Sequence, residues 1–206
     1  MNIPQHSPAA ERNLPPILAA LQRLLPARGS ALEIASGTGQ HVAGLGKGLP
    51  GWTWQPSDAQ DEAFGSIAYW CDQAGVANVA APLLLNVLDS WPLHPPFDAI
   101  YCANMLHISP WATCAALMRG AAQYLAPHGL LITYGPYLEN GVPTSLGNLD
   151  FDADLRQSDQ SWGIRPLDAV VQQAALAGLE LQERVAMPAN NLLLVFSFSA
   201  SPPPAP

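Results

Sequence analysis

The segment Ala31-Leu-Glu-Ile-Ala-Ser-Gly-Thr-Gly-Gln-His41 is the part of the sequence that most clearly indicates the fold. Its apolar first half predicts a strand, and Ser36-Gly37-Thr38-Gly39 predicts a tight turn that leads into a helix. Small residues let the backbone approach a ligand closely, and the N-terminus of a helix presents free N–H groups. Ligands of open α/β sheets bind at the carboxyl ends of strands, so we expect Glu33 and the turn at a ligand site.

Alternating strand and helix patterns follow this segment and predict a layered α/β domain. The continuous apolar run 81–87 predicts a strand buried on both faces. The last two strands are joined by a short connection and are therefore expected to be antiparallel neighbours. The predicted strands are 31–34, 51–55, 81–87, 97–103, 130–134, 179–186 and 192–199. The predicted helices are 13–25, 40–47, 61–74, 111–125 and 167–178, with Asn13 and Ser109 as candidate caps. We expect no regular structure in the segment 137–165.

Length and composition limit the class of protein. The 206 residues are consistent with one domain, which we place at 1–199, followed by a disordered proline-rich tail at 200–206. The formal net charge of −8, with only eight lysines and arginines, argues against a nucleic-acid partner. The three cysteines lack metal-ligand spacing, so no metal site is expected. Without a signal segment or a long apolar run, we expect a cytoplasmic protein and no membrane partner.

Two acceptor residues at strand ends favour a nucleoside ligand. Asp58 follows the second strand, 19 residues after Gly39, where a carboxylate accepts hydrogen bonds from ribose hydroxyls. Asn86 and the backbone of Val87 follow the third strand, where they would contact an adenine edge, or Asn86 would only form a turn. A nicotinamide dinucleotide is a weaker alternative because Val42 stands where its fingerprint has a third glycine.

The segment Asn104-Met-Leu-His-Ile-Ser-Pro-Trp111 follows the fourth strand and holds the candidate base His107. An equally simple interpretation is a histidine that is hydrogen-bonded at a helix start. Two further residues have a structural interpretation beside the functional one. His41 would only pack at the start of a helix, and Trp111 would only be part of the core. In the polar segment 136–166, Arg156 and Arg165 are candidate clamps for an anionic group, although most charges in such a loop are solvated.

The chain resembles the class I S-adenosylmethionine-dependent methyltransferases. Their acid-plus-glycine motif is matched by Glu33 to Gly39 and their ribose-binding acid by Asp58, while Ala35 and Asn86 depart from a common glycine and aspartate. More specifically, the chain is similar to the methyltransferase-like 26 family. The matching segments are Ser7-Pro-Ala-Ala-Glu-Arg-Asn13, 32–41, Trp54-Gln-Pro-Ser-Asp58, 104–111, Tyr134-Gly-Pro136, Asn148 with Phe151-Asp152, Trp162-Gly-Ile-Arg165 and Met187-Pro-Ala-Asn-Asn191.

The resemblance implies a Rossmann-like fold, with a seven-stranded sheet in the order 3-2-1-4-5-7-6, strand 7 antiparallel, and helices on both faces. It also implies transfer of a methyl group from S-adenosylmethionine to a small molecule, in a pocket at the carboxyl ends of strands 1, 4 and 5, leaving S-adenosylhomocysteine. The segments 1–26 and 136–166 would cover this pocket, and the protein would be a monomer or homodimer. A protein that binds the cofactor without transferring its methyl group is the alternative.

The resemblance and the residue positions together give the expected site. The expected cofactor-binding residues are Glu33, Ala35, Ser36, Gly37, Gly39, Asp58, Asn86, Val87, Asn104 and Met105. The expected substrate-binding residues are Glu11, Arg12, Asn13, His41, Trp111, Asn148, Asp152, Arg165 and Asn190. His107 is the expected base, with Tyr134 second.

Overall fold

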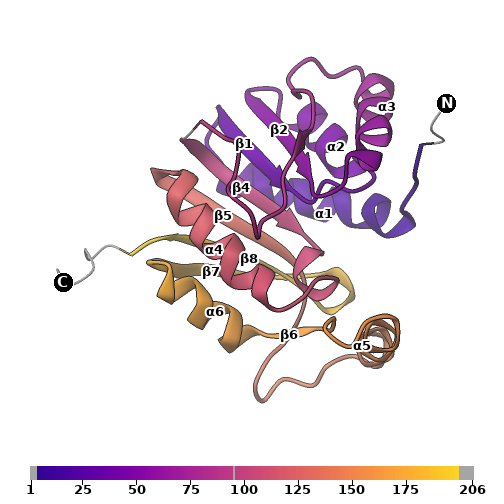
Figure 1. Ribbon diagram of the computed structural model, residues 1–206, viewed down its shortest axis with the longest axis vertical. Coiled ribbons are helices and arrows are strands. Elements are labelled where there is room, and N and C mark those ends of the chain that lie inside the picture. Colours follow the sequence, from indigo (N-terminus) through magenta and orange to yellow (C-terminus); the bar gives the residue numbers. More distant parts are fainter. Residues whose placement is uncertain (1–3, 95, 200–206) are drawn as a thin grey trace. The chain divides into compact units, whose positions relative to one another are not determined.

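The computed structural model describes residues 4–94 and 96–199 (Figure 1). The proposed tail at 200–206 lies outside the described residues. The described residues divide into two compact units, the first made of those up to Leu93 together with Phe97–Cys102. The second unit contains the described residues from Ala103 onward together with His94 and Pro96.

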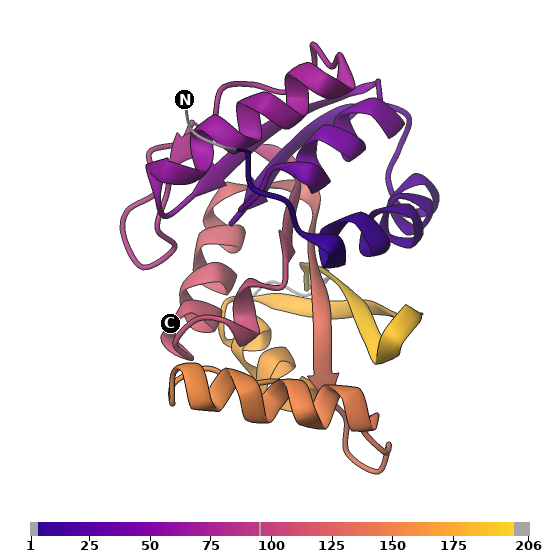
Figure 2. The ribbon, with the colours of Figure 1, turned by 90° about the vertical axis from the view of Figure 1, so that its right-hand side faces the viewer.

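The first unit is a parallel sheet with a row of helices. Its strands are paired in the order β3-β2-β1-β4, as predicted. Helix α2 contacts both α1 and α3, and Figure 2 shows the three helices in purple and indigo. The elements are α1 (Pro8–Leu24), β1 (Gly29–Ile34), α2 (Gln40–Gly48), β2 (Trp52–Asp58), η1 (Asp61–Ala63), α3 (Phe64–Ala74), β3 (Leu83–Leu84) and β4 (Phe97–Ala103).

Two expectations for this unit were wrong. The third strand has only two residues, and Leu84 is 57% exposed instead of buried on both faces. It lies next to β2 at the edge of the sheet, and edge strands are commonly short. Helix α1 begins before Asn13, because Ser7 accepts a hydrogen bond from the Ala10 N–H and a proline follows at the first helical position.

The second unit is built around an antiparallel group of strands. The order β5-β8-β7 and the antiparallel final strand agree with the prediction, while β6 adds a short parallel pair with β5. The elements are η2 (Met105–His107), α4 (Ala112–Tyr124), β5 (Leu125–Leu138), α5 (Leu146–Ser158), β6 (Arg165–Pro166), α6 (Leu167–Leu176), β7 (Leu179–Met187), η3 (Pro188–Asn190) and β8 (Asn191–Phe198).

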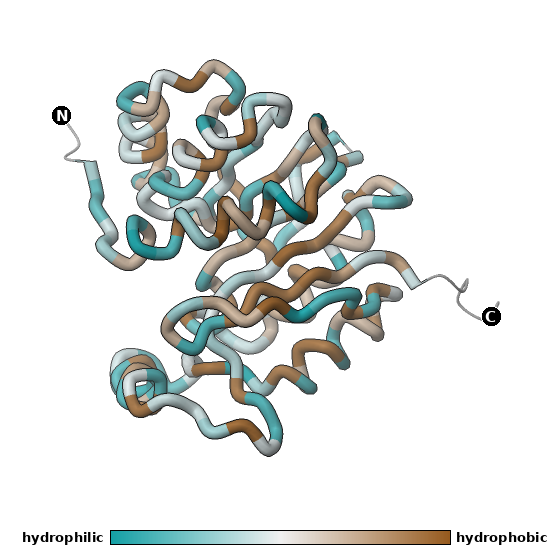
Figure 3. The backbone as a smooth tube through the Cα atoms, turned by 180° about the vertical axis from the view of Figure 1, so that it is seen from behind, coloured by the Kyte–Doolittle hydropathy of each residue, from teal (hydrophilic) through white to brown (hydrophobic). Residues whose placement is uncertain are grey.

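Helix α5 occupies a segment that we expected to be irregular. Only Leu155 of its 13 residues is buried, so the sequence shows no apolar face. The helix instead begins with a side-chain cap, in which Ser145 accepts a hydrogen bond from the Asn148 N–H. Figure 3 shows the contrast between mixed colours along α5 and mainly hydrophobic residues along β8.

The predicted cap of α4 was also wrong. This helix has Trp111 at its N-cap position and no side-chain cap. The Ser109 hydroxyl lies 2.7 Å from the Met105 carbonyl oxygen and 2.7 Å from the Thr113 hydroxyl. Ser109 therefore stabilises the loop before the helix and does not cap the first turn of the helix.

Candidate functional site

The turn between β1 and α2 has three residues in the left-handed region. Their φ angles are 56° at Ala35, 53° at Gly37 and 84° at Gly39. A Cβ atom on Gly39 would lie 2.5 Å from the Ile67 Cα, so only glycine fits there. A Cβ atom on Gly37 would meet nothing nearer than 4.0 Å. Gly37 is thus the open side of the turn, where a ligand has access to the backbone.

Asp58, the last residue of β2, stabilises this turn through hydrogen bonds. One carboxylate oxygen accepts a 2.8 Å hydrogen bond from the Gly37 N–H, and the other accepts a 3.1 Å bond from the Gln60 N–H. A carboxylate has about four acceptor positions, so each oxygen retains the capacity to accept another bond. This arrangement suits the predicted recognition of two ribose hydroxyls.

Glu33 is a buried acid at the carboxyl end of β1. It is 2% exposed, and its Oε2 atom has no hydrogen-bond partner among the described residues. Burial raises the pKa of Glu33 to about 8, with a smaller contribution from the charge of Asp58, while a hydrogen bond with the Ser36 side chain acts to lower it. A buried acceptor without a partner is costly, and a ligand ammonium group would satisfy it.

Asn86 adopts the turn role that was one of its two interpretations. Its side-chain oxygen accepts a 3.0 Å hydrogen bond from the Leu88 N–H, and the residue is exposed. Val87 is buried, and its carbonyl accepts a bond from the Trp91 indole. The side-chain oxygen of Asn86 is therefore already engaged within the chain.

His41 is held by contacts within the first unit. Its Nε2 atom lies 3.2 Å from the Ala10 carbonyl and its Nδ1 atom 3.4 Å from the Tyr101 hydroxyl. Because a carbonyl only accepts, Nε2 carries the proton and Nδ1 accepts from the tyrosine. Burial lowers the pKa of His41 to about 4. These contacts favour the structural interpretation over substrate binding.

The N-terminal segment is tied to the glycine turn, a connection that no sequence motif predicted. The side-chain oxygen of Gln40 accepts hydrogen bonds from the Ser7 N–H at 2.6 Å and the Thr38 hydroxyl at 3.1 Å. Ser66 accepts from the Gln5 N–H and donates to the Thr38 carbonyl. Of the expected substrate residues in α1, Glu11 and Arg12 are exposed and Asn13 is half-buried.

In the second unit, His107 packs against the strand residue Gly135. A Cβ atom on Gly135 would lie 3.2 Å from the imidazole, so the ring needs the space that glycine leaves. Asn104 precedes this segment with a φ of 62°, and its N–H donates to the Tyr134 carbonyl at 2.8 Å. Burial, with the Arg165 charge as a smaller cause, lowers the pKa of His107 to about 4.

Two aromatic side chains complete this region. The Tyr134 hydroxyl is buried without a hydrogen-bond partner among the described residues, and burial raises the pKa of Tyr134 to about 12. The Phe151 ring lies edge-on to the His107 ring, with centroids 5.5 Å apart. His107 is thus a neutral proton acceptor at pH 7 in an apolar setting.

Arg165 holds the loop that contains His107, and this differs from its predicted role as an anion clamp. It donates to the carbonyls of Leu106 at 2.8 Å, Ser109 at 2.6 Å and Ser161 at 2.7 Å. Its guanidinium carbon also lies 5.6 Å from the centroid of the Trp111 ring. Three of the five N–H donors of the guanidinium are therefore directed at backbone carbonyls of the chain.

The other predicted anion clamp and its neighbours are likewise engaged. Arg156 forms a 2.8 Å ion pair with Asp152, whose second oxygen accepts from the Ile164 N–H at 2.6 Å. The Asn148 amide donates to the Asn190 carbonyl at 3.1 Å and joins the start of α5 to η3. Met105 is buried. These contacts order the segment that was expected to cover a substrate.

Metal ligation and membrane insertion find no support in the described ranges 4–94 and 96–199. No group of three or more histidine, cysteine, aspartate or glutamate residues is placed there to hold a metal ion. No helix in these ranges is long and apolar enough to cross a membrane.

The chain belongs to the family described as "Protein of unknown function (DUF938)", whose model matches residues 4–198. The family model matches nearly all of the described residues, and its description names no activity.

The chain is similar in fold to three solved structures that are described as methyltransferases. CalO1, a methyltransferase in calicheamicin biosynthesis in its SAH-bound form, has a TM-score of 0.77 at 15% identity, covering 93% of this chain and 54% of its own. An O-methyltransferase family 2 protein from Planctomyces limnophilus, in complex with apigenin, has a TM-score of 0.77 at 22% identity. The match covers 93% of this chain and 58% of that protein. NcsB1 from neocarzinostatin biosynthesis, with S-adenosylmethionine and 2-hydroxy-5-methyl naphthoic acid, has a TM-score of 0.74 at 15% identity, covering 93% and 55%.

These similarities confirm the predicted Rossmann-like methyltransferase fold. The chain spans little more than half the length of each of these three proteins, with coverage between 54% and 58%.

Proposed function

We propose that the chain is an S-adenosylmethionine-dependent methyltransferase that acts on a small molecule. The observation that carries the proposal is Glu33, a buried acid that directly precedes the open glycine turn. One of its carboxylate oxygens has no hydrogen-bond partner in the part of the chain that the structure describes. The amino group of the methionine part of the cofactor is a cation of the kind that this oxygen lacks. A nicotinamide dinucleotide carries no such ammonium group beside its pyrophosphate.

The cofactor contacts are assigned to the groups that retain hydrogen-bonding capacity. Glu33 binds the ammonium group, and the backbone from Ala35 to Gly39 lies against the methionine part. Asp58 accepts hydrogen bonds from the ribose hydroxyls with the lone pairs that Gly37 and Gln60 leave free. Val87 contacts the adenine, with Asn86 in a secondary role because its oxygen already serves a turn. Ser36, Asn104 and Met105 remain assigned to the cofactor.

S-adenosylmethionine, when bound, supplies a methyl group already activated by its sulfonium. The chain then has to orient the acceptor, exclude water and remove a proton where the acceptor carries one. His107 is neutral at pH 7 and is the residue that we assign to proton removal. The buried Tyr134 hydroxyl, which has no partner among the described residues, is assigned to hydrogen bonding with the acceptor.

The acceptor is proposed to be a small molecule because the net charge of −8 disfavours nucleic acid. Two of the similar methyltransferases were solved with small aromatic molecules, apigenin and a naphthoic acid. We further place the chain among the methyltransferase-like 26 proteins, as a cytoplasmic monomer or homodimer. The odd number of cysteines, three in all, and their lack of motif spacing agree with a reducing compartment.

Calorimetric titration with S-adenosylhomocysteine and, separately, with NADH tests the cofactor assignment. We expect saturable binding of S-adenosylhomocysteine and none of NADH, and the reverse result would refute the proposal. Transfer of a labelled methyl group from S-adenosylmethionine, screened over metabolite pools, then tests catalysis. Cofactor binding with no transfer to any pool would favour the alternative of a binding protein without transferase activity.

A further inference from the structure

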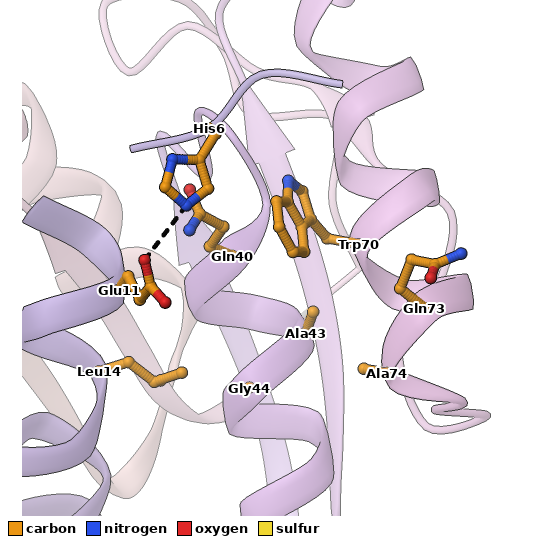
Figure 4. A pocket seen from close by; sticks show the side chains of 9 residues that line it. All are labelled: His6, Glu11, Leu14, Gln40, Ala43, Gly44, Trp70, Gln73 and Ala74. Atoms are coloured by element: carbon orange, nitrogen blue, oxygen red, sulfur yellow. Dashed lines mark ion pairs between the residues drawn. The ribbon is translucent and has the colours of Figure 1, made fainter. Parts of the chain in front are cut away.

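A pocket of about 270 Å³ opens on the first unit between α1, α2 and α3. Figure 4 shows Glu11 and Leu14 of α1 on one side, Trp70 and Ala74 of α3 on the other, and Ala43 of α2 between them. None of the four residues 36–39 of the glycine turn lines this pocket. Its volume is near the lower end of the range for small-molecule sites, so it suits a ligand with one ring.

An aromatic wall dominates one side of the pocket. The Trp70 indole N–H donates to the Gln5 carbonyl at 2.8 Å, and the Tyr69 ring lies at a right angle to the indole, with centroids 5.6 Å apart. Trp70 still lines the pocket. The His6 ring lies 5.9 Å from the Trp70 ring, measured between centroids, at an angle of 42°. The small side chains of Ala43 and Ala74 leave space beside the indole.

The charge of the pocket is negative. Glu11 contributes a carboxylate at the rim, 3.2 Å from the His6 Nε2 atom, and its side chain is 70% exposed. The lining contains neither lysine nor arginine, and Gln40 and Gln73 contribute uncharged amides. An ion pair this exposed is weak, so a competing cation can replace the imidazole at Glu11.

We propose that this pocket binds a small organic cation, a protonated or quaternary amine attached to a single ring. The ring packs on Trp70, and the ammonium group lies within reach of Glu11 and close to the indole face, where cations are attracted to the aromatic π-system. None of the residues assigned to the cofactor lines this site, and Glu11, one of the expected substrate-binding residues, is assigned here to the cation.

The probe is phenethylammonium, titrated into the nitrogen-15-labelled full-length protein by NMR. Phenylacetate and 2-phenylethanol provide the matched anion and neutral molecule. We expect saturable shifts at the Trp70 indole N–H and at the Ala43 and Ala74 amides, with at least about threefold weaker binding of the alcohol. Phenylacetate should leave these resonances unchanged.

Variants separate the aromatic and charge contributions. We expect Trp70→Leu to weaken phenethylammonium binding about tenfold, and Glu11→Gln about fivefold. Adding Gln73→Glu to Glu11→Gln places a carboxylate on another lining residue and should recover part of the affinity. Glu62→Gln removes an exposed acid outside the pocket and is the matched control.

Three results would overturn the proposal. Equal binding of phenylacetate at the same amides would contradict the selection for a cation. Equal effects of Glu11→Gln and Glu62→Gln would contradict the role of the rim carboxylate. Shifts that cluster away from Trp70, Ala43 and Ala74 would place the cation elsewhere.

Discussion

The amide N–H of Gly37 donates a 2.8 Å hydrogen bond to Asp58, which lies 21 residues further along the chain. This bond connects the end of β2 to the turn that follows β1. The two motifs that indicate a nucleoside site in the sequence are thus one hydrogen-bonded unit in the structure. Asp58 consequently has two roles, as the support of the turn and as the proposed acceptor for the ribose.

Asp58→Ala removes both roles at once. We expect S-adenosylhomocysteine to bind more weakly by about 1–3 kcal/mol, because the ribose hydroxyls lose their charged acceptor. Calorimetric titration measures this change, and Asp61→Ala, an exposed acid in the following element, is the control. An unchanged dissociation constant would count against the ribose assignment.

Glu33 makes stability depend on pH. Its pKa is 4.5 in the unfolded reference and about 8 in the fold, so between these values the folded state holds a proton that the unfolded state has lost. Its contribution to the free energy of unfolding therefore falls as pH rises through this window, by at most about 1.4 kcal/mol per pH unit. Glu33→Gln, which resembles the protonated acid, removes this slope.

Urea unfolding of the wild type and of Glu33→Gln at intervals from pH 5 to pH 9 measures the effect. The difference between the two proteins isolates Glu33 from His41 and His107. Because the pKa of each of these histidines is lowered to about 4, their contributions rise with pH at the acidic end. Parallel curves for the two proteins would show that Glu33 does not titrate as expected.

Arg165 supports the loop that carries His107 through geometry as well as charge. Arg165→Lys keeps the charge but cannot donate to the carbonyls of Leu106, Ser109 and Ser161 together. We expect a loss of about 2–4 kcal/mol in the free energy of unfolding, measured with urea. Arg156→Lys alters an exposed ion pair and should cost less than about 1 kcal/mol. Equal losses in the two variants would contradict the role assigned to Arg165.

Gln40 connects the N-terminal segment to the glycine turn. In Gln40→Ala, the Ser7 N–H loses its acceptor, so we expect its amide hydrogen exchange to accelerate at least about tenfold. The Gln5 N–H donates to the Ser66 hydroxyl in the same segment, and its exchange, measured by NMR, should also accelerate. Gln172→Ala on the exposed side of α6 is the control. Protection of Ser7 equal to that of the wild type would show that Gln40 is dispensable for this connection.

The sequence was most informative where a strand ended in a turn. Glu33 and Asp58 were placed correctly at strand ends because glycine and apolar periodicity are local signals. The edge strand β3 was predicted too long and the helix α5 was missed, because the hydrophobic pattern of each segment does not specify its structure. Helix α5 depends on its Ser145 cap and on the bond between Asn148 and Asn190, which lie 42 residues apart.

The backbone partners of His41 and Arg165 could not be predicted from the sequence for a related reason. Each donates to backbone carbonyls far along the chain, at Ala10 for the histidine and at Leu106 and Ser109 for the arginine. A backbone carbonyl has no residue type, so no motif marks it as a partner. Residues of catalytic appearance can therefore be occupied structurally without any sign in the sequence.

Ala35 provides a test of how the turn is strained. Its φ of 56° lies in the left-handed region, which costs a residue with a Cβ about 1–2 kcal/mol. The related methyltransferase motif commonly has glycine here, so Ala35→Gly should raise the free energy of unfolding by about 0.5–1 kcal/mol, after the added flexibility of the unfolded chain. Ala99→Gly, at a buried strand position without a positive φ, should instead lower it by about 1 kcal/mol. Urea unfolding of both variants checks the opposite signs, and destabilisation by both would show that the turn imposes no strain on Ala35.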